Sequence, residues 1–123
     1  MAREMKVPGP DHPISVEPEP ERVVVRAGGG VVADTTRALA LHEAGHEAVL
    51  YIPREDVADS ALSPTPSHTY CPYKGEASYF ALRCPDGRLL DDAVWSYEDP
   101  YPAVREIAGH LAFYPQHVTF ARS

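Results

Sequence analysis

Short apolar runs separated by glycine and proline set the pattern of the chain after its first 21 residues. Residues 23–27 and 31–34 flank three consecutive glycines and predict two β-strands joined by a glycine turn. Residues 35–41 continue either as a strand or as a short helix. Residues 48–52 predict the next strand, which ends at Pro53 because proline has no amide hydrogen to donate to a strand ladder.

The second half of the chain alternates apolar and polar positions with the period of a β-strand. Residues 78–84 predict a strand, one face of which carries Phe80, Leu82 and Cys84. Residues 85–87 (Pro-Asp-Gly) predict a hairpin turn, because proline presets its backbone angle and glycine accepts the left-handed one. Further strands are predicted at residues 88–90, 93–97, 111–114 and 118–121.

One convincing helix is predicted, near residues 100–108. Asp99 is suited to cap its start and Gly109 to end it, and apolar residues recur along one face. Residues 54–57 suit a single helical turn. Residues 60–67 contain two prolines and predict a loop.

The first residues differ in composition from the rest of the chain. Five of the 13 prolines lie between positions 8 and 20, interleaved with acidic residues, which predicts an extended arm over residues 1–21. Residues 22–123 then form a single domain, because 123 residues suffice for one hydrophobic core and are too few for two. The predicted fold class is mainly β with one short helix.

Charge and apolar runs argue against two classes of partner. Lys and Arg number 11 against 18 Asp and Glu, and the formal net charge of -7 disfavours a nucleic-acid surface. No apolar run approaches the roughly 18 residues of a membrane span, and the N-terminus lacks the apolar core of a signal peptide. We therefore expect a cytoplasmic protein that binds neither nucleic acid nor membrane. Its two cysteines, Cys71 and Cys84, fit a reducing compartment.

Residues 42–46 (HEAGH) match the HExxH pattern of zinc hydrolases. That chemistry requires a helix that places both imidazoles on one face, with the glutamate as general base and a third ligand downstream. Gly45 weakens a helix and the segment joins two strand-like runs, so we predict a tight β-turn and no metal site. A zinc hydrolase that uses His42 and His46 is kept as an alternative.

Four sequence motifs follow one another in the chain: residues 51–57 (YIPREDV), 68–79 (with HTYCPYKG and Ser-Tyr), 94–102 (VWSYEDPYP) and 107–114 (IAGH and Phe-Tyr). In these motifs the chain resembles the small bacterial family called domain of unknown function 427. The resemblance implies a compact, mainly β domain with a twisted antiparallel sheet, for which a tent-like shape is one of the forms it allows, and self-association as a homodimer. It implies no established activity and leaves the cofactor open. The family's nucleotidyltransferase-like label finds little support, because Gly28-Gly29-Gly30 is not followed by a lysine.

Residues 68–80 gather a thiol, an imidazole, an ammonium group and four aromatic rings, a composition typical of a pocket lining or a partner surface. Cys71 is a candidate nucleophile, and Lys74 is a candidate for anion binding or a Schiff base. His68 and His110 are candidate proton carriers, because an unperturbed imidazole titrates near neutrality. Each also has a plainer interpretation, as a buried thiol, a solvent-exposed turn lysine or a hydrogen-bonded histidine.

Further side chains are candidates for ligand binding. Arg54 would select an anion together with Lys74 if both faced one pocket, and aromatic rings would stack on a planar ligand. The candidate ligand-binding residues are Arg54, Tyr70, Tyr79, Trp95 and Tyr97. The preferred hypothesis is a pocket for a small polar or anionic ligand, with or without catalysis. The alternative is a homodimeric interaction module that buries the same rings and carries out no reaction.

Overall fold

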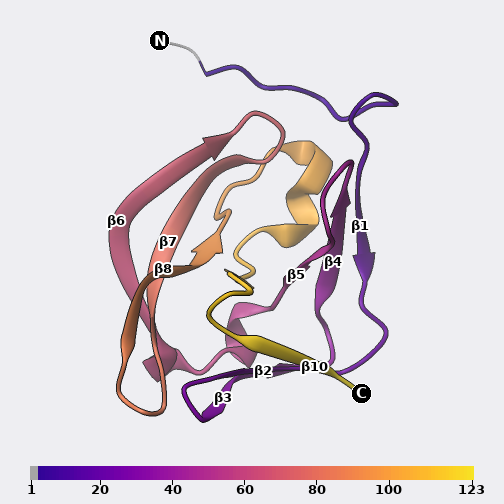
Figure 1. Ribbon diagram of the computed structural model, residues 1–123. Coiled ribbons are helices and arrows are strands. Elements are labelled where there is room, and N and C mark those ends of the chain that lie inside the picture. Colours follow the sequence, from indigo (N-terminus) through magenta and orange to yellow (C-terminus); the bar gives the residue numbers. More distant parts are fainter. Residues whose placement is uncertain (1–2) are drawn as a thin grey trace.

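Ten β-strands in three antiparallel sheets dominate residues 3–123, the part of the chain that the computed structural model describes (Figure 1). The first sheet, in the order β1-β4-β5, consists of Ile14–Pro18, Leu39–Glu43 and Val49–Tyr51. The second, in the order β10-β2-β3, consists of Thr119–Arg122, Val23–Ala27 and Gly30–Thr35. The third, in the order β6-β7-β8-β9, consists of Leu62–Cys71, Gly75–Arg83, Leu89–Ser96 and Ala112–Phe113. The predicted mainly β fold is confirmed.

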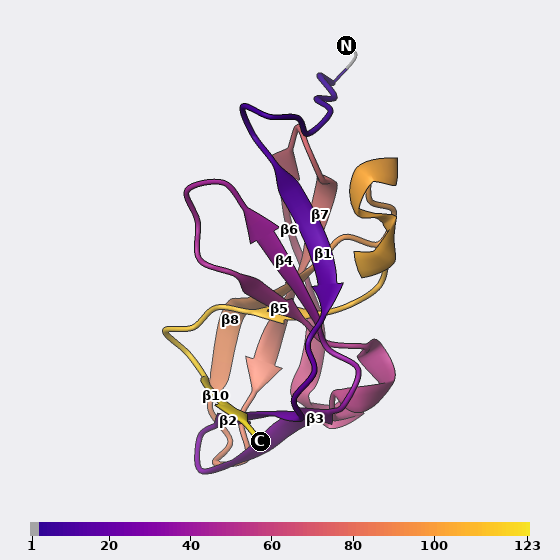
Figure 2. The ribbon, with the colours of Figure 1, turned by 90° about the vertical axis from the view of Figure 1, so that its right-hand side faces the viewer.

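The three sheets enclose the core from different sides. In Figure 1 the third sheet stands on the left, the first on the right, and the second crosses the bottom. Figure 2, turned by 90°, shows β1 and β4 in front of β6 and β7. Side chains of the first and third sheets therefore meet between the two sheets.

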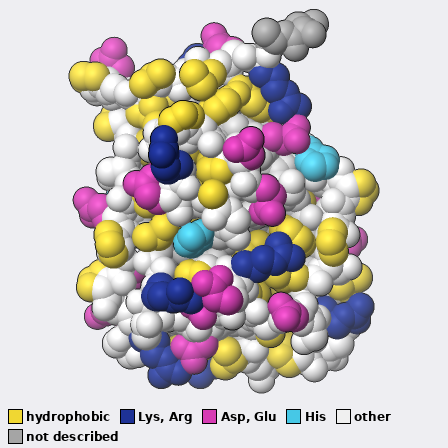
Figure 3. Space-filling model, turned by 180° about the vertical axis from the view of Figure 1, so that it is seen from behind, with side chains coloured by type: hydrophobic (Ala, Val, Ile, Leu, Met, Phe, Trp, Pro, Cys, Tyr) yellow, Lys and Arg dark blue, Asp and Glu magenta, His cyan; other side chains and the backbone are white. Residues whose placement is uncertain are grey.

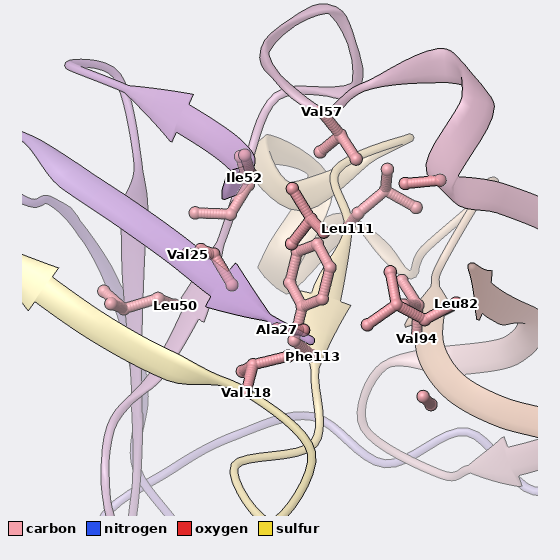
Figure 4. Packing of buried hydrophobic residues seen from close by; sticks show 14 of the residues in the cluster. Val25, Ala27, Leu50, Ile52, Val57, Leu82, Val94, Leu111, Phe113 and Val118 are labelled. Atoms are coloured by element: carbon pink, nitrogen blue, oxygen red, sulfur yellow. The ribbon is translucent and has the colours of Figure 1, made fainter. Parts of the chain in front are cut away.

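Two hydrophobic clusters form the core, because neighbouring residues of a strand point to opposite faces. In β5, for example, Leu50 belongs to the larger cluster and Tyr51 to the smaller one. The larger cluster includes Val25 of β2 and Leu82 of β7, so it joins the second sheet to the third (Figure 4). The smaller cluster lies between the first and third sheets and contains the three buried tyrosines, Tyr51, Tyr79 and Tyr97.

The predicted glycine turn between β2 and β3 is confirmed, and it packs against the turn between β7 and β8. A Cβ atom added to Gly28 would lie 2.5 Å from Cβ of Cys84, and one added to Gly30 would lie 2.5 Å from Cγ of Pro85. Gly28 also has a φ of +56°, a left-handed conformation that side chains disfavour. Both the turn and the close approach of the second hairpin therefore require glycine.

Three short 3₁₀-helices complete the described elements: η1 (Arg54–Asp56), η2 (Asp59–Ala61) and η3 (Pro102–Ile107). The helical turn predicted near residues 54–57 corresponds to η1. The helix predicted near residues 100–108 corresponds to η3, where Val104 and Ile107 are buried, whereas Ala108 is exposed. Val104 has non-helical backbone angles, which breaks η3 in the middle.

The loop predicted at residues 60–67 is wrong, because η2 and the first half of β6 occupy it. The two prolines that suggested a loop, Pro64 and Pro66, are tolerated since β6 is an edge strand. Pairing with β7 is irregular between Pro64 and His68. The missing proline amides thus interrupt one ladder without ending the strand.

The hairpin predicted around residues 85–87 is confirmed, but its return arm is one strand rather than two. β8 runs through Asp92, which has a φ of +54° beside an irregularity in the β7–β8 pairing. The hydroxyl groups of Thr65 and Ser67 donate hydrogen bonds of 2.5 and 2.7 Å to the carboxylate of Asp92. These bonds hold the strand together at the position that suggested a break.

Part of the segment expected as an extended arm belongs to a sheet. Residues Ile14–Pro18 form β1, which pairs with β4 so that Ile14 lies opposite Glu43. Nearer the N-terminus, the amide of Lys6 donates a hydrogen bond of 2.8 Å to the carbonyl of Pro72. The chain around Lys6 therefore lies along the β6–β7 turn rather than away from the domain.

The charge of the surface and the length of the helices are relevant to the expectation that the protein binds neither nucleic acid nor membrane. The face in Figure 3 intersperses acidic with basic side chains and carries no broad positive patch. Within residues 3–123, the longest helix has six residues, and no helix is long and apolar enough to cross a bilayer.

Candidate functional site

A cavity of about 230 Å³ opens between the first and third sheets. We call it the Lys74 cavity, after the buried lysine in its wall. Five aromatic side chains make up much of its lining: Tyr51 of β5, Tyr79 of β7, Trp95 of β8, and Tyr97 and Tyr114, which directly follow β8 and β9. The charged and titratable lining side chains, apart from the tyrosines, are Glu43, His46, Glu47 and Lys74.

Strand periodicity places these side chains at the cavity. Leu41 and Glu43 are two residues apart on β4, so they share the face that the first sheet turns toward the third. Tyr79 and Trp95 lie directly opposite each other across the β7–β8 ladder. Tyr97 is two residues beyond Trp95 and continues the same face.

Lys74 sits in the turn between β6 and β7, where its amide donates a hydrogen bond of 3.2 Å to the carbonyl of Cys71. Gly75 follows with a φ of +109°, which completes the turn. The turn directs the lysine inward, and the residue is only 9% exposed. Its Nζ lies 2.7 Å from Oε1 of Glu43 and 3.7 Å from Sγ of Cys71.

Glu43 accepts hydrogen bonds from two sides. Its Oε1 bonds to Lys74, and its Oε2 lies 2.6 Å from Nε2 of His12, which stacks on Tyr73 with ring centroids 4.1 Å apart. Burial by itself would raise the pKa of the Glu43 carboxyl, but the hydrogen bonds from Lys74 and His12 lower this pKa below its ordinary value. Glu43 is therefore a carboxylate at neutral pH, and Lys74 faces a full negative charge.

The aromatic rings hold one another in place. The indole Nε1 of Trp95 donates a hydrogen bond of 3.3 Å to the hydroxyl of Tyr51, and the two rings are nearly perpendicular. The ring of Tyr114 also packs against the ring of Trp95, with centroids 4.5 Å apart. The hydroxyls of Tyr79 and Tyr114 are 3.4 Å apart. Such mutual contacts give a cavity wall that is formed before any ligand arrives.

Three tyrosine hydroxyls of the cavity, those of Tyr51, Tyr97 and Tyr114, have raised pKa values and are neutral. Burial raises the pKa of Tyr51 and of Tyr97 far above the range of physiological pH. Burial, together with the hydrogen bond to Tyr79, raises the pKa of Tyr114 to about 12. Within residues 3–123 the hydroxyl of Tyr97 makes no hydrogen bond, so it is free to bond with a ligand.

The structure brings together part of the predicted site. Lys74, Tyr79, Trp95 and Tyr97 line the Lys74 cavity, and Cys71 contacts the Lys74 ammonium group from behind the lining. These five residues come from β6, β7 and β8 and the connections next to them, so the hairpin architecture is what unites them.

Four other predicted residues lie elsewhere. His68 is half-exposed on β6, with Nδ1 3.7 Å from Glu76, and Tyr70 bonds to the hydroxyl of Tyr101. Arg54 and His110 line a separate cavity of about 440 Å³, which we call the Arg54 cavity. The Arg54 guanidinium lies 5.2 Å from the ring centroid of Phe80. Arg54 and Lys74 therefore do not face one pocket.

The HEAGH segment is a strand end and a turn. His42 and Glu43 end β4, and Gly45 takes a φ of +77° in the turn toward β5. The helix on which HExxH chemistry depends is not formed, and His42 is half-exposed with Nε2 3.8 Å from Glu17. In the described chain, no three His, Cys, Asp or Glu side chains are grouped closely enough to hold a metal ion.

Sequence reasoning did not predict several lining residues for this site, among them Glu43, Glu47, Tyr51 and Tyr114. It considered Glu43 only as the general base of the alternative zinc site. One signal was present: Leu39, Leu41 and Glu43 follow a period of two, so the carboxylate continues an apolar face. Tyr51 and Tyr114 lie in runs that look like plain core strands.

Comparison with models of protein families assigns most of the chain to a family. A family model described as a domain of unknown function (DUF427), with a short name that refers to NTP transfer, matches residues 15–122. The match covers most of the chain and includes all of β1 except Ile14, although this segment was expected to lie outside the domain. Among curated proteins, none matches this sequence.

Proposed function

This chain belongs to the DUF427 family, whose function is unknown, and from that premise we propose that it binds a small polar molecule in the Lys74 cavity. One observation carries the proposal: a buried ion pair, Lys74 with Glu43, faces a cavity whose other walls are mostly aromatic. Apolar walls with a few convergent polar groups are the usual make-up of a ligand site.

The ion pair is difficult to explain by stability alone. Side chains of Lys74 and Glu43 are only 11% and 15% exposed, so both charges have lost most of their water. Replacing a buried ion pair by well-packed apolar residues is often neutral or stabilising. Charges retained at the wall of a cavity are therefore better explained by contact with a ligand.

Size and hydrogen-bonding capacity narrow the ligand. A volume of about 230 Å³ lies below the roughly 300–1,000 Å³ of sites for drug-sized molecules, which favours a metabolite of modest size. The Tyr97 hydroxyl supplies a neutral donor or acceptor. Because Glu43 already neutralises Lys74, these contacts favour a polar ligand over a simple anion.

Other parts of the functional hypothesis stay predictions. A reaction at Cys71 or Lys74 is supported by the 3.7 Å contact between Sγ and Nζ. Within residues 3–123, His68 lies beside Glu76 and His110 lines the Arg54 cavity, and neither histidine hydrogen-bonds to Cys71 or Lys74. Self-association as a homodimer and a cytoplasmic location also stay predictions.

The single tryptophan of the chain makes the proposal easy to test. Because Trp95 lines the cavity, a ligand that enters it changes the tryptophan fluorescence, and binding to the folded state raises the melting temperature. We would titrate the protein with nucleosides, sugars, amines, carboxylates and inorganic phosphate, and record both signals. A panel without any response in either signal would contradict the proposal.

A pair of matched variants locates the binding. Tyr97→Phe removes the free hydroxyl and should weaken the ligand about five- to tenfold, the usual effect of one lost hydrogen bond, without lowering the melting temperature. Tyr101→Phe removes a hydroxyl outside the cavity and should leave affinity unchanged. Equal affinities in both variants would place the ligand elsewhere.

A further inference from the structure

We infer that the ligand of the Lys74 cavity carries a cationic ammonium group, an inference that rests on the proposed function. The sequence favoured the opposite ligand charge, since Lys74 is a candidate for binding an anion. The arrangement of charge and of aromatic rings around the cavity reverses that expectation.

The charge left over at the cavity is negative. The positive charge of Lys74 is neutralised by Glu43, whose Oε1 lies 2.7 Å from Nζ, and the second oxygen of Glu43 hydrogen-bonds to His12. Glu47, in the loop between β4 and β5, also lines the cavity, and it forms no ion pair with any residue from 3 to 123. One carboxylate at the exposed mouth is therefore available to an incoming cation.

The remaining titratable group at the mouth is His46, next to Glu47 in the same loop. It is exposed and forms no ion pair within the described residues, so it does not neutralise Glu47 by direct contact. The chain as a whole has a formal net charge of -7, which adds a general attraction for cations. Neither feature would help an anion to enter.

The aromatic lining of the Lys74 cavity also favours a cationic ligand. A cation is attracted to the face of a tryptophan or tyrosine ring, and several rings around one ammonium group form the known type of aromatic cage. Tyr51 and Tyr114 contact Trp95 at interplanar angles of 88° and 46°. Rings at such different inclinations surround a roughly spherical group better than a flat one.

The test compares choline with its neutral carbon isostere, in which a tert-butyl group replaces the trimethylammonium group. Both compounds have nearly the same shape, so a difference in affinity reports the charge. We expect choline to bind about two- to thirtyfold more tightly, the range of a cation against aromatic rings, when Trp95 fluorescence is followed at millimolar concentrations. Fluorescence controls with free tryptophan exclude quenching in solution.

A matched pair of glutamate variants tests the carboxylate. Glu47→Gln should weaken choline severalfold and leave the neutral isostere unaffected. Glu106→Gln removes the same charge from an exposed position of η3 outside the cavity and should change neither affinity. Equal weakening by both variants would show that only net charge matters, and would overturn the role of Glu47.

The outcomes separate this inference from the proposed function. If the isostere binds as tightly as choline, or if inorganic phosphate or acetate changes Trp95 fluorescence and choline does not, the ligand is not cationic although the cavity still binds. If no compound of the wider panel changes fluorescence or melting temperature, the proposed function fails and the inference fails with it.

Discussion

The ammonium group of Lys74 lies 2.7 Å from Oε1 of Glu43, although the two residues are 31 positions apart, Glu43 at the end of β4 in the first sheet and Lys74 in the β6–β7 turn of the third. The contact spans the gap between the end of β4 and the β6–β7 turn, so it fixes the first sheet against the third. It also forms part of the cavity wall. Stability and binding are therefore coupled at this pair.

Removing one partner of the pair should destabilise the fold. Lys74→Met leaves the Glu43 carboxylate buried with only His12, and we expect a loss of about 3 kcal/mol in the free energy of unfolding, measured by urea denaturation. The matched control is Lys6→Met, the other lysine of the chain, which is half-exposed and 3.8 Å from Glu4. That variant should change stability by less than about 0.5 kcal/mol.

A double variant shows whether the loss of stability comes from the missing contact or from the buried, unpaired carboxylate of Glu43. In Lys74→Met with Glu43→Gln, no buried carboxylate remains, so part of the loss should be recovered and the coupling energy should be about 1–3 kcal/mol. Additive losses in the double variant would mean that the 2.7 Å contact contributes little to stability.

The lowered pKa of Glu43 predicts how this stabilisation depends on pH. Since the folded-state pKa lies below the unfolded one, the stabilisation is fully present above the unfolded pKa and is lost as pH falls through the folded value. The difference in unfolding free energy between the wild type and Glu43→Gln should therefore be largest near neutrality. It should shrink below about pH 4, where an unfolded glutamate takes up its proton. A difference that stayed constant into that range would contradict a lowered pKa.

Much of the fold follows from local patterns in the sequence. The glycine turn between β2 and β3 and the hairpin at residues 85–87 were predictable, because each depends on residues next to one another. β1 and β6 were not predictable in this way. β1 is recognisable only through its partner β4, and the prolines of β6 are acceptable only because one side of that strand is unpaired.

Only one wall of the Lys74 cavity, the one formed by the third sheet, was predictable from the sequence. Trp95 and Tyr97 share a face because they are two residues apart, Tyr79 lies opposite Trp95 on the neighbouring strand, and Lys74 lies in the turn of the β6–β7 hairpin. The opposite wall comes from β4 and β5, and no local pattern states which sheet will face the hairpin. For this reason the period of two in β4 places Glu43 on an apolar strand face, but does not identify it as the partner that neutralises Lys74.

The two cysteines should differ in reactivity. Cys71 is partly exposed and its Sγ lies 3.7 Å from the ammonium of Lys74, which stabilises negative charge on sulfur during alkylation. Cys84 is buried in the larger core cluster. We expect iodoacetamide to modify Cys71 well before Cys84 in the folded protein, as measured by peptide mass spectrometry.

Lys74→Met should slow the labelling of Cys71, and this control is informative under conditions where the variant remains folded. Cys84 then serves as an internal reporter, because its labelling rises only when the core opens. Faster labelling of Cys84 than of Cys71 in the wild type would contradict the described burial.

Neighbouring glycines in the β2–β3 turn should respond differently to the same substitution. Gly28 and Gly29 both have a left-handed backbone, with φ of +56° and +80°, so alanine introduces comparable backbone strain at either, about 1 kcal/mol. Only at Gly28 would the new Cβ also meet Cβ of Cys84, at 2.5 Å, whereas nothing lies within 4 Å at Gly29. Gly28→Ala should therefore lose about 1–3 kcal/mol more than Gly29→Ala in thermal or urea unfolding, the usual range for overpacking. Equal losses would show that the turn conformation, and not the contact between the two hairpins, is what requires glycine at this corner of the fold.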